Sequence, residues 1–559
     1  MKNIRKITLI LFVGAFLGSC TSDWLDINDN PNVPTKPELS QMLSFSELYM
    51  TSAFGHGNFL GNALSAYMHQ SVSREAQNYG MNMQANNILN TWNYCYIYAL
   101  KNFDGIIEFA EPNDNLIYAG VAKTLKAYTF SIMVDLWGDI PYSEFNIPGN
   151  IEPNLDSGKD IYNELFALLA EASADLQNTT VVNALKPGSD DFFYAGDVDK
   201  WVKLNNTIQL KLLLQSRKAK SDITDWQGKF NALMSADNFI ASGEDFQFMY
   251  PGGTNPQDMR HPAFSSSGYY TGQHTFYISP FFYETMKGDT YNTTDNPFAG
   301  IEDPRVPYYF YNQLTPTGAS ANPHEYRNGQ FMSIFFATNG PNGAHSSDAY
   351  FSKVGIYANG GKFDTGAGGA TSLSTGNGIA PDKLITFYAL KFMLAELALV
   401  GETSGDAKVM LQEAIIAAFA HVNSVVALGN QAGVPQIESD DRDAYITAVM
   451  AKYDAANAAG KLRILMTQKW IANFMSPIDS YTDYRRTGYP TLFDPSMTED
   501  PGYGVNPTPT ENSAAQVPFM NFSAFPRSLY YPSASETSLN PNLTQKSNLA
   551  TPFIFWDKN

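Results

Sequence analysis

Apolar residues recur at intervals of three and four along much of the chain, the spacing that places side chains on one face of an α-helix. The clearest run covers residues 116–137 and ends at Gly138. A second run begins after an N-cap at Asp156 or Ser157, and a third begins near Asp199. Successive helices of this kind pack as antiparallel pairs or as a helical solenoid. The apolar stripe of the first run consists of Ile117, Val121, Leu125, Tyr128, Ile132 and Leu136.

The helical period is absent from residues 238–381, where Gly, Asn, Ser and aromatic residues dominate. It returns in residues 382–476 and is lost again in 481–559, which are rich in Pro. No polar linker separates these parts, so the pattern predicts a single all-α domain over residues 39–559, with a helical core at about 39–236 and 382–476. The two irregular segments are long, and such segments often carry function. Helices are expected in the second half at about 382–400, 406–425, 441–455 and 461–475.

The first twenty residues have the parts of a secretory signal. Three basic residues precede the apolar stretch 7–17, which is shorter than the ~20 residues that cross a bilayer. The stretch ends in Leu17-Gly18-Ser19-Cys20, a pattern that resembles the cleavage site of bacterial lipoproteins. We therefore expect residues 1–19 to be a lipoprotein signal peptide and residues 20–38 to be a tether that is lipidated at Cys20. An ordinary signal peptide with a chance Cys is the alternative.

The composition is that of a large acidic protein with an extensive core. The chain has 559 residues, of which 44% are hydrophobic and 14% aromatic. Its net charge of −19 argues against nucleic-acid binding, because phosphate recognition needs clustered Lys and Arg. A lipidated Cys20 leaves Cys95 as the only other thiol, so stability must come from the core rather than from disulfides. We expect Cys95 to be a buried helix residue, with a reactive thiol as the alternative.

No sequence motif predicts a catalytic, cofactor or metal site. The chain has no G-x-S-x-G, H-E-x-x-H, C-x-x-C or Walker sequence. Asp135 and Asp139 are the nearest pair of carboxylates that could flank a glycosidic bond, but they lie at a helix end. Asp26, Asn28 and Asn30 have the first three spacings of a calcium loop, but a proline replaces its glycine. We therefore expect no enzyme, no cofactor and no metal, with a glycan-active enzyme as an alternative.

Charged residues near the end of the helical pattern have two interpretations. Arg485 and Arg486 beside Asp483 have the composition of a carboxylate-binding fork, and also of an internal charge network that clamps the tail onto the last helix. We favour the network. Glu396 lies in an apolar helix, and a buried carboxylate needs a partner, so we expect it to form a structural hydrogen bond or ion pair.

Short blocks along the chain resemble, in the same order, those of a known family. An Asp-, Asn- and Pro-rich stretch at 25–35 comes first, and Thr467-Gln468-Lys469-Trp470 lies near the end. The longest blocks are Asp135-Leu136-Trp137-Gly138-Asp139-Ile140-Pro141-Tyr142, Tyr194-Ala195-Gly196-Asp197, Tyr484-Arg485-Arg486-Thr487-Gly488-Tyr489-Pro490 and Tyr530-Tyr531-Pro532. Together they resemble the SusD/RagB family of nutrient-binding outer-membrane lipoproteins, in its SusD-like branch.

This resemblance implies a fold, a cellular location and a partner protein. The fold would be an all-α scaffold of tetratricopeptide-like helical repeats with a large irregular, loop-rich ligand-binding region, although no 34-residue repeat is evident in the sequence. The protein would be lipid-anchored in the outer membrane and face the cell exterior. It would bind a glycan or oligosaccharide and act as the lid of a SusC-like TonB-dependent transporter. A peptide ligand, as in some family members, is the alternative.

The aromatic-rich irregular segments are the predicted ligand-binding region. Residues 264–311 contain 14 aromatic residues in 48, about twice the proportion of the whole chain. Aromatic rings stack on the apolar face of a sugar, while neighbouring polar groups bind its hydroxyls. For any single ring taken alone, we favour a place in the core. Family sites are built from the N-terminal helix–loop region and the central segment, which here indicates Arg74, Gln77, Asn78, Tyr79, Trp92, Asn93, Tyr269, Tyr270, His274 and Tyr277.

Overall fold

A computed structural model describes residues 38–57, 59–73, 85–269, 276–290, 295–318, 326–334, 350–492 and 524–559. The predicted signal peptide, Cys20 and most of the tether lie outside the described residues, as do the calcium-like spacings at Asp26, Asn28 and Asn30. The expectations for these residues therefore stay predictions.

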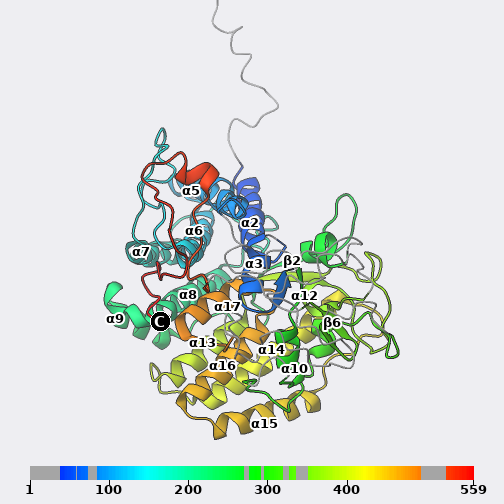
Figure 1. The fold of residues 1–559 in the computed structure, drawn as a ribbon. Helices are drawn as coiled ribbons and strands as arrows, with labels where there is room; N and C mark the ends of the chain where they lie inside the picture. Colours follow the sequence, from blue (N-terminus) through cyan, green and yellow to red (C-terminus); the bar gives the residue numbers. More distant parts are fainter. Residues whose placement is uncertain are drawn as a thin grey trace, which may run out of the picture.

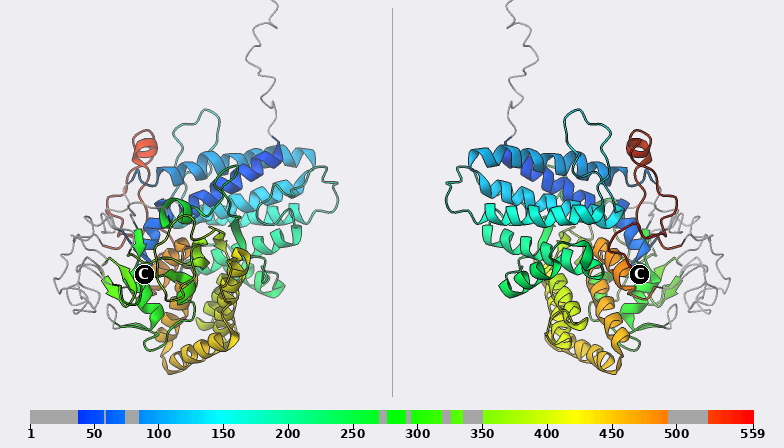
Figure 2. Two further views of the ribbon diagram at one scale, coloured as in Figure 1. Left: turned by 90° about the vertical axis from the view of Figure 1, so that its right-hand side faces the viewer. Right: turned by 90° about the vertical axis from the view of Figure 1, so that its left-hand side faces the viewer.

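The first half of the chain is a stack of helices. Figure 2 shows them as near-parallel rows in blue, cyan and green. The 116–137 prediction is confirmed by α6 (Leu116–Trp137), which packs between α5 and α7. More of α6 is buried than the single predicted apolar stripe indicates, because Lys123 and Asp135, on other faces of the helix, are buried too. The remaining elements are α2 (Leu39–Phe54), α3 (Phe59–Tyr67), α4 (Leu89–Asn93), η3 (Tyr94–Leu100), α5 (Lys101–Ala110), η4 (Glu111–Asn113), α7 (Gly158–Leu176), α8 (Val198–Gln215), η5 (Ser216–Asp222) and α9 (Trp226–Ala236).

Local capping sets the helix boundaries in this half. Ser157 is the N-cap of α7 and accepts a hydrogen bond from the Asp160 backbone N–H at 3.3 Å. Gly138 ends α6 at a φ of 82°, and a Cβ atom there would lie 2.8 Å from the Phe553 carbonyl oxygen. Cys95 is fully buried in η3, and burial raises the pKa of its thiol, which confirms the expected buried residue.

The second half is helical as predicted, with two corrections. Its helices are α13 (Phe387–Leu399), α14 (Ala407–Gly429), α15 (Ser439–Ala455), α16 (Ala458–Ala472) and α17 (Pro477–Thr487). Residues 382–385, expected to be helical, belong to strand β8 (Ala380–Ile385), which pairs with β2 (Phe246–Tyr250). Residues 481–487, expected to be irregular, are helical, because Pro477 begins α17 and Gly488 ends it in the left-handed conformation.

The central segment has short elements joined by loops, as expected. Its strands form two-stranded antiparallel sheets, β1–β3, β2–β8, β4–β7 and β5–β6, with no larger sheet among the described residues. The pair β1–β3 joins the N-terminal region to the central segment, with Ser73 opposite Phe276. Figure 1 shows the elements of the central segment (green) beside α3 and above α15. They are η6 (Ala263–Gly268), β3 (Phe276–Ile278), α10 (Pro280–Lys287), α11 (Val306–Tyr309), β4 (Phe310–Tyr311), β5 (Tyr326–Asn328), β6 (Phe331–Ser333), β7 (Lys353–Val354) and α12 (Ile356–Asn359), while β1 (Ser71–Ser73) belongs to the N-terminal part.

The C-terminal residues return to the end of α6, beside the N-terminal helices (red in Figure 2). The Trp137 indole donates to the Tyr530 carbonyl oxygen at 2.9 Å, and the Tyr531 hydroxyl donates to the Asp139 carbonyl oxygen at 2.7 Å. The Trp556 indole donates to the Asp135 carboxylate at 2.8 Å. One hydrophobic cluster accordingly contains buried residues from Leu39 to Trp556. The short helix η8 (Ser533–Thr537) belongs to this returning segment.

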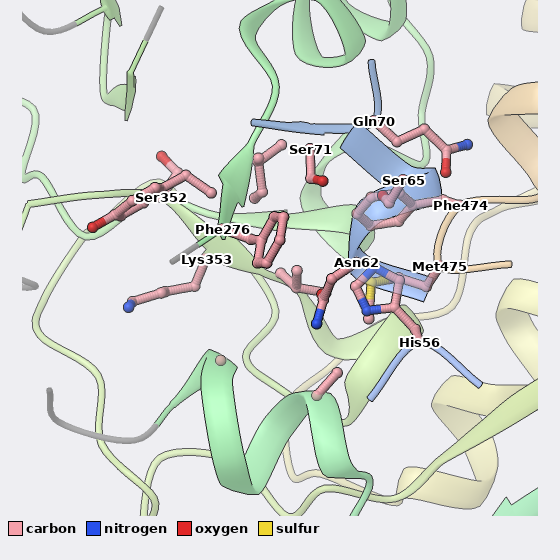
Figure 3. A pocket seen from close by; sticks show the side chains of 15 residues that line it. His56, Asn62, Ser65, Gln70, Ser71, Phe276, Ser352, Lys353, Phe474 and Met475 are labelled. Carbon is pink, nitrogen blue, oxygen red and sulfur yellow. The ribbon is translucent and has the colours of Figure 1, made fainter. Parts of the chain in front are cut away.

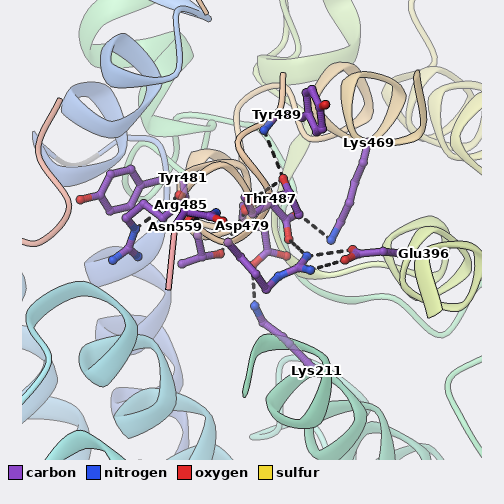
Figure 4. A network of polar contacts seen from close by, with 12 residues as sticks. Lys211, Glu396, Lys469, Asp479, Tyr481, Arg485, Thr487, Tyr489 and Asn559 are labelled. Atoms are coloured by element: carbon purple, nitrogen blue, oxygen red, sulfur yellow. Dashed lines mark hydrogen bonds and ion pairs between the residues drawn. The ribbon is translucent and has the colours of Figure 1, made fainter. Parts of the chain in front are cut away.

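A buried charge network joins α13, α16 and α17 (Figure 4). The Arg486 guanidinium binds the Glu396 carboxylate and the Asp483 carboxylate, the latter at 2.7 Å. Lys469 also binds Asp483, at 2.7 Å, and Arg485 donates to the backbone carbonyls of Asp135 and Arg527. Both arginines are at most 1% exposed. The network interpretation is therefore confirmed, and Glu396 has the predicted ion-pair partner.

We expect the Arg486→Met variant to lower the free energy of unfolding by about 3–5 kcal/mol, because it leaves two buried carboxylates without their shared cation. The matched control is Lys408→Met, which removes the exposed ion pair with Asp454 and costs at most about 1 kcal/mol. Urea unfolding followed by circular dichroism measures both. Equal losses in the two variants would contradict the role given to Arg486.

The same network makes stability depend on acidity. Burial raises the pKa of Asp483, but Lys469 and Arg486 outweigh it and hold this pKa below its ordinary value. A carboxylate with a lowered folded-state pKa stabilises the fold above its unfolded pKa of about 3.9 and loses that contribution as the pH falls further. Asp483→Asn should therefore be less stable than the wild type at pH 7, and the difference should shrink below about pH 4. Melting temperatures between pH 3 and pH 7 check this, and a difference independent of pH would contradict it.

Candidate ligand-binding surface

Four aromatic residues form a cluster on the outer face of α2 and η3. Phe45 and Tyr49 are four residues apart on α2, and Tyr94 and Tyr98 are four apart on η3, so each pair shares one helix face. Tyr49 stacks on Tyr98 with ring centroids 4.5 Å apart, and also contacts Phe45 at 4.5 Å and Tyr94 at 5.2 Å. Phe45 is 40% exposed and the three tyrosines are half-buried. We call these four residues the aromatic cluster.

The backbone under the cluster has an uncommon form. Residues Tyr94–Leu100 form a π-helix between two α-helices, and such turns are frequent at functional sites. Leu48 and Ile97, on the same two elements, are 41% and 50% exposed. Contiguous exposed apolar residues on a soluble protein commonly mark a binding surface.

A cleft of about 210 Å³ adjoins the cluster and shares Tyr94 with it. Tyr250, on β2, also lines this cleft, and further aromatic rings continue from it. The ring centroid of Phe248 lies 5.1 Å from that of Tyr250, and the ring centroid of Phe192 lies 5.6 Å from that of Phe248. The cleft is lined by Ser52, Gly55, Gly57, Tyr94, Tyr250, Pro262 and Asp382.

A hydrogen-bonded carboxylate stabilises the base of the cleft. Asp382 accepts from the His261 ring at 3.1 Å, the Tyr250 hydroxyl at 3.1 Å and the His56 backbone N–H at 3.3 Å. His261 Nδ1 accepts from the Ala263 backbone, so its Nε2 carries the proton donated to Asp382. Burial raises the pKa of Asp382, but these partners outweigh it and lower the pKa. Gly55 permits the close packing, because a Cβ there would lie 2.2 Å from the Asp382 carboxylate.

The two carboxylates considered for glycosidic-bond cleavage have structural partners. Asp135 is buried and accepts from the Tyr162 hydroxyl at 2.5 Å, while Asp139 accepts from the Gly158 backbone N–H at 2.9 Å. Both carboxylates therefore stabilise the end of α6. Among the described residues, no group of three or more His, Cys, Asp or Glu side chains has the geometry to hold a metal ion.

Three of the rings predicted to bind ligand lie in the core. Trp92 is 2% exposed and packs against Trp137 and Tyr531. Tyr269 is 1% exposed, and its hydroxyl donates to the Val354 carbonyl oxygen at 2.9 Å. Tyr277 is buried in β3, next to Phe351. Core packing is the interpretation favoured above for each ring taken alone. Asn93 is half-buried and directly precedes η3.

The other predicted binding residues are Arg74, Gln77, Asn78, Tyr79, Tyr270 and His274, which lie outside the described residues. The described ends of their two segments are neighbours, because Ser73 pairs with Phe276. This pairing brings the N-terminal and central parts of the chain together. The predicted site draws residues from both parts and therefore requires them to be neighbours.

The sequence analysis did not identify the aromatic cluster. Its signal was two aromatic pairs at a spacing of four, Phe45 with Tyr49 and Tyr94 with Tyr98. Trp92 belongs to the same stretch as Tyr94 and Tyr98, but it faces the returning C-terminal segment. Which ring of a stretch faces solvent is decided by such distant contacts.

Comparisons with known proteins agree with the fold. The SusD-like family model, described as starch-binding and associating with the outer membrane, matches residues 31–508. A chitin-binding protein of solved structure is 19% identical, with a TM-score of 0.65 over 93% of this chain and all of its own. A chitin-binding SusD homolog from Flavobacterium johnsoniae has 19% identity and a TM-score of 0.60, over 93% of this chain and 99% of its own. A SusD homolog from Bacteroides fragilis has 17% identity and a TM-score of 0.63, over 94% of this chain and all of its own.

No protein with a curated description matches the sequence. The structural neighbours confirm the all-α, tetratricopeptide-like scaffold with an irregular region. The family model covers most of the chain, in the order of helices and loops described above. The protein therefore belongs to the SusD-like family.

Proposed function

We propose that this protein is a surface-exposed outer-membrane lipoprotein that binds a glycan or oligosaccharide nutrient and delivers it to a SusC-like TonB-dependent transporter as its lid. The observation that carries the binding function is the aromatic cluster of Phe45, Tyr49, Tyr94 and Tyr98, beside a cleft with polar groups. The transporter partner and the lid role rest on membership of the family.

The partly exposed aromatic rings and the net charge of the protein support a sugar ligand. Polar contacts to a solvated hydroxyl contribute little net free energy, so stacking on rings supplies most of the affinity for a carbohydrate. The cluster offers partly exposed rings of Phe45, Tyr49 and Tyr98 within 6.0 Å of one another. The net charge of −19 disfavours a polyanionic ligand and suits a neutral glycan. The family description and the two chitin-binding neighbours support a polysaccharide as the ligand.

We expect Phe45→Ala and Tyr49→Ala each to weaken glycan binding about tenfold, which corresponds to the loss of one stacked ring. The matched control is Phe553→Ala, whose ring is 38% exposed, against 40% for Phe45, but lies in the C-terminal segment. Calorimetry with maltohexaose, chitohexaose and a casein-derived peptide pool measures the affinities and separates glycan from peptide. If neither sugar binds, or if all three variants bind like the wild type, the proposed binding surface is wrong.

Anchoring by Cys20 has its own test. Cys20→Ser should move the protein from the outer-membrane fraction to the soluble fraction, because it removes the thiol that carries the diacylglycerol. Intact-mass measurement of the mature wild type should give an acylated N-terminus at Cys20. A wild-type mass without acyl chains would refute the lipoprotein assignment while leaving the glycan measurements untouched.

A further inference from the structure

A second cavity lies between the N-terminal helices and the central segment and is lined by His56, whose sequence neighbours Gly55 and Gly57 line the cleft. This cavity has a volume of about 70 Å³ (Figure 3). Strands β1, β3 and β7 and the end of α16 enclose it. Asn62, Gly268, Phe276 and Val354 are partly exposed and mark its mouth, while the other lining residues are buried.

Four buried polar atoms in the wall of this cavity have no hydrogen-bond partner in the structure. They are His56 Nδ1, Ser65 Oγ, Gln70 Oε1 and Ser71 Oγ, and each residue is at most 8% exposed. An unsatisfied buried polar atom costs about 1–3 kcal/mol, so such atoms are rare in native proteins and rarely gather in one place. Their concentration around one cavity indicates that a polar occupant belongs there.

The orientation of these groups defines what they can bind. The Gln70 side-chain N–H donates to the Trp470 carbonyl oxygen at 2.8 Å, so its Oε1 is an acceptor that needs an N–H or O–H donor. The hydroxyls of Ser65 and Ser71 can each donate to a carbonyl oxygen. The occupant therefore needs a donor for Gln70 Oε1, and an acceptor on the same occupant can be bound by the serine hydroxyls.

The surrounding groups also limit the charge of the occupant. Burial, with His261 and Lys383 nearby, lowers the pKa of His56 to about 3, so its ring is neutral at physiological pH. The Lys353 ammonium group points away from His56 and Asn62 (Figure 3). Among the described residues, no Asp or Glu lines the cavity, and the one Lys or Arg in its lining, Lys353, is directed away from these polar groups, so an uncharged occupant fits them best.

The size and the apolar lining of the cavity limit which groups can occupy it. A cavity of about 150 Å³ holds the six heavy atoms of benzene, so 70 Å³ accommodates about three heavy atoms, which is a substituent and not a sugar ring. The apolar side chains of Ile278, Phe474 and Met475 also line it. The acetyl part of an acetamido group has three heavy atoms, with a carbonyl acceptor and a methyl group for the apolar side chains, and the amide N–H that joins it to the sugar is a donor.

We propose that this cavity is a subsite that receives the acetamido group of an N-acetylated sugar. In it Gln70 Oε1 accepts from the amide N–H, the Ser65 and Ser71 hydroxyls donate to the carbonyl oxygen, and the methyl group contacts Phe474 and Met475. This inference rests on the proposed function and makes it more specific, because it selects amino-sugar glycans among the neutral polysaccharides.

The test compares chitohexaose with cellohexaose, which carries a hydroxyl in place of each acetamido group. The wild type should bind chitohexaose at least tenfold more tightly. Ser71→Val fills the cavity and suits a strand, and it should reduce this preference to about twofold while leaving cellohexaose binding unchanged. Tyr49→Ala is the contrasting variant, because it should weaken both sugars by the same factor.

A second serine variant and a crystal structure test the subsite even if Ser71→Val fails to fold. Ser65→Ala removes one donor without adding volume and should reduce the preference. A crystal structure of the wild type with chitohexaose should show an acetyl group in the cavity. Equal affinity for both sugars, an unchanged preference in both serine variants, or ordered water alone in the cavity would overturn the subsite. Binding of maltohexaose with no preference for acetamido groups would overturn it while leaving glycan capture intact.

Discussion

Two adjacent buried arginines in α17 connect the two helical halves of the molecule. Arg486 binds Glu396 of α13 and Asp483, while Arg485 donates to the end of α6 through the Asp135 carbonyl and to the C-terminal segment through the Arg527 carbonyl. A guanidinium group removed from water is costly unless carboxylates or carbonyl oxygens compensate its charge, so each arginine permits few arrangements of the elements around it. The relative positions of α6, α13 and α17 depend on that requirement.

The scaffold held in this way presents the aromatic cluster on an α-helix and a π-helix rather than on loops. The packed helices beneath α2 and η3 hold the exposed rings in place. A ligand that covered these rings would therefore cost little side-chain entropy. The loop-rich central segment rests on the same stack through small sheets, of which β1–β3 and β2–β8 join it to the helical parts. Binding chemistry in this protein is thus an addition to a helical-repeat fold that by itself implies no ligand.

The cleft and the cavity meet at one turn. Gly55 and Gly57 line the cleft, and His56 between them lines the cavity while its backbone N–H binds Asp382. The Asp382 carboxylate also pairs with His261 and Tyr250, so the turn is attached to the central segment and to β8 at once.

Helical periods, caps and charges are local properties of the chain, and they were predictable. Residues 116–137 form a helix that ends at Gly138, as their spacing predicts, and Ser157 is the N-cap of α7. A single carboxylate in an apolar helix predicted a partner for Glu396, and the order of short blocks predicted the family. Tertiary contacts account for the rest: residues 382–385 pair as a strand with β2, Trp92, Tyr269 and Tyr277 are buried, and Phe45, Tyr49, Tyr94 and Tyr98 gather on the surface. Strand pairing and burial depend on contacts between residues far apart in the chain, such as Trp92 with Tyr531, which no local period encodes.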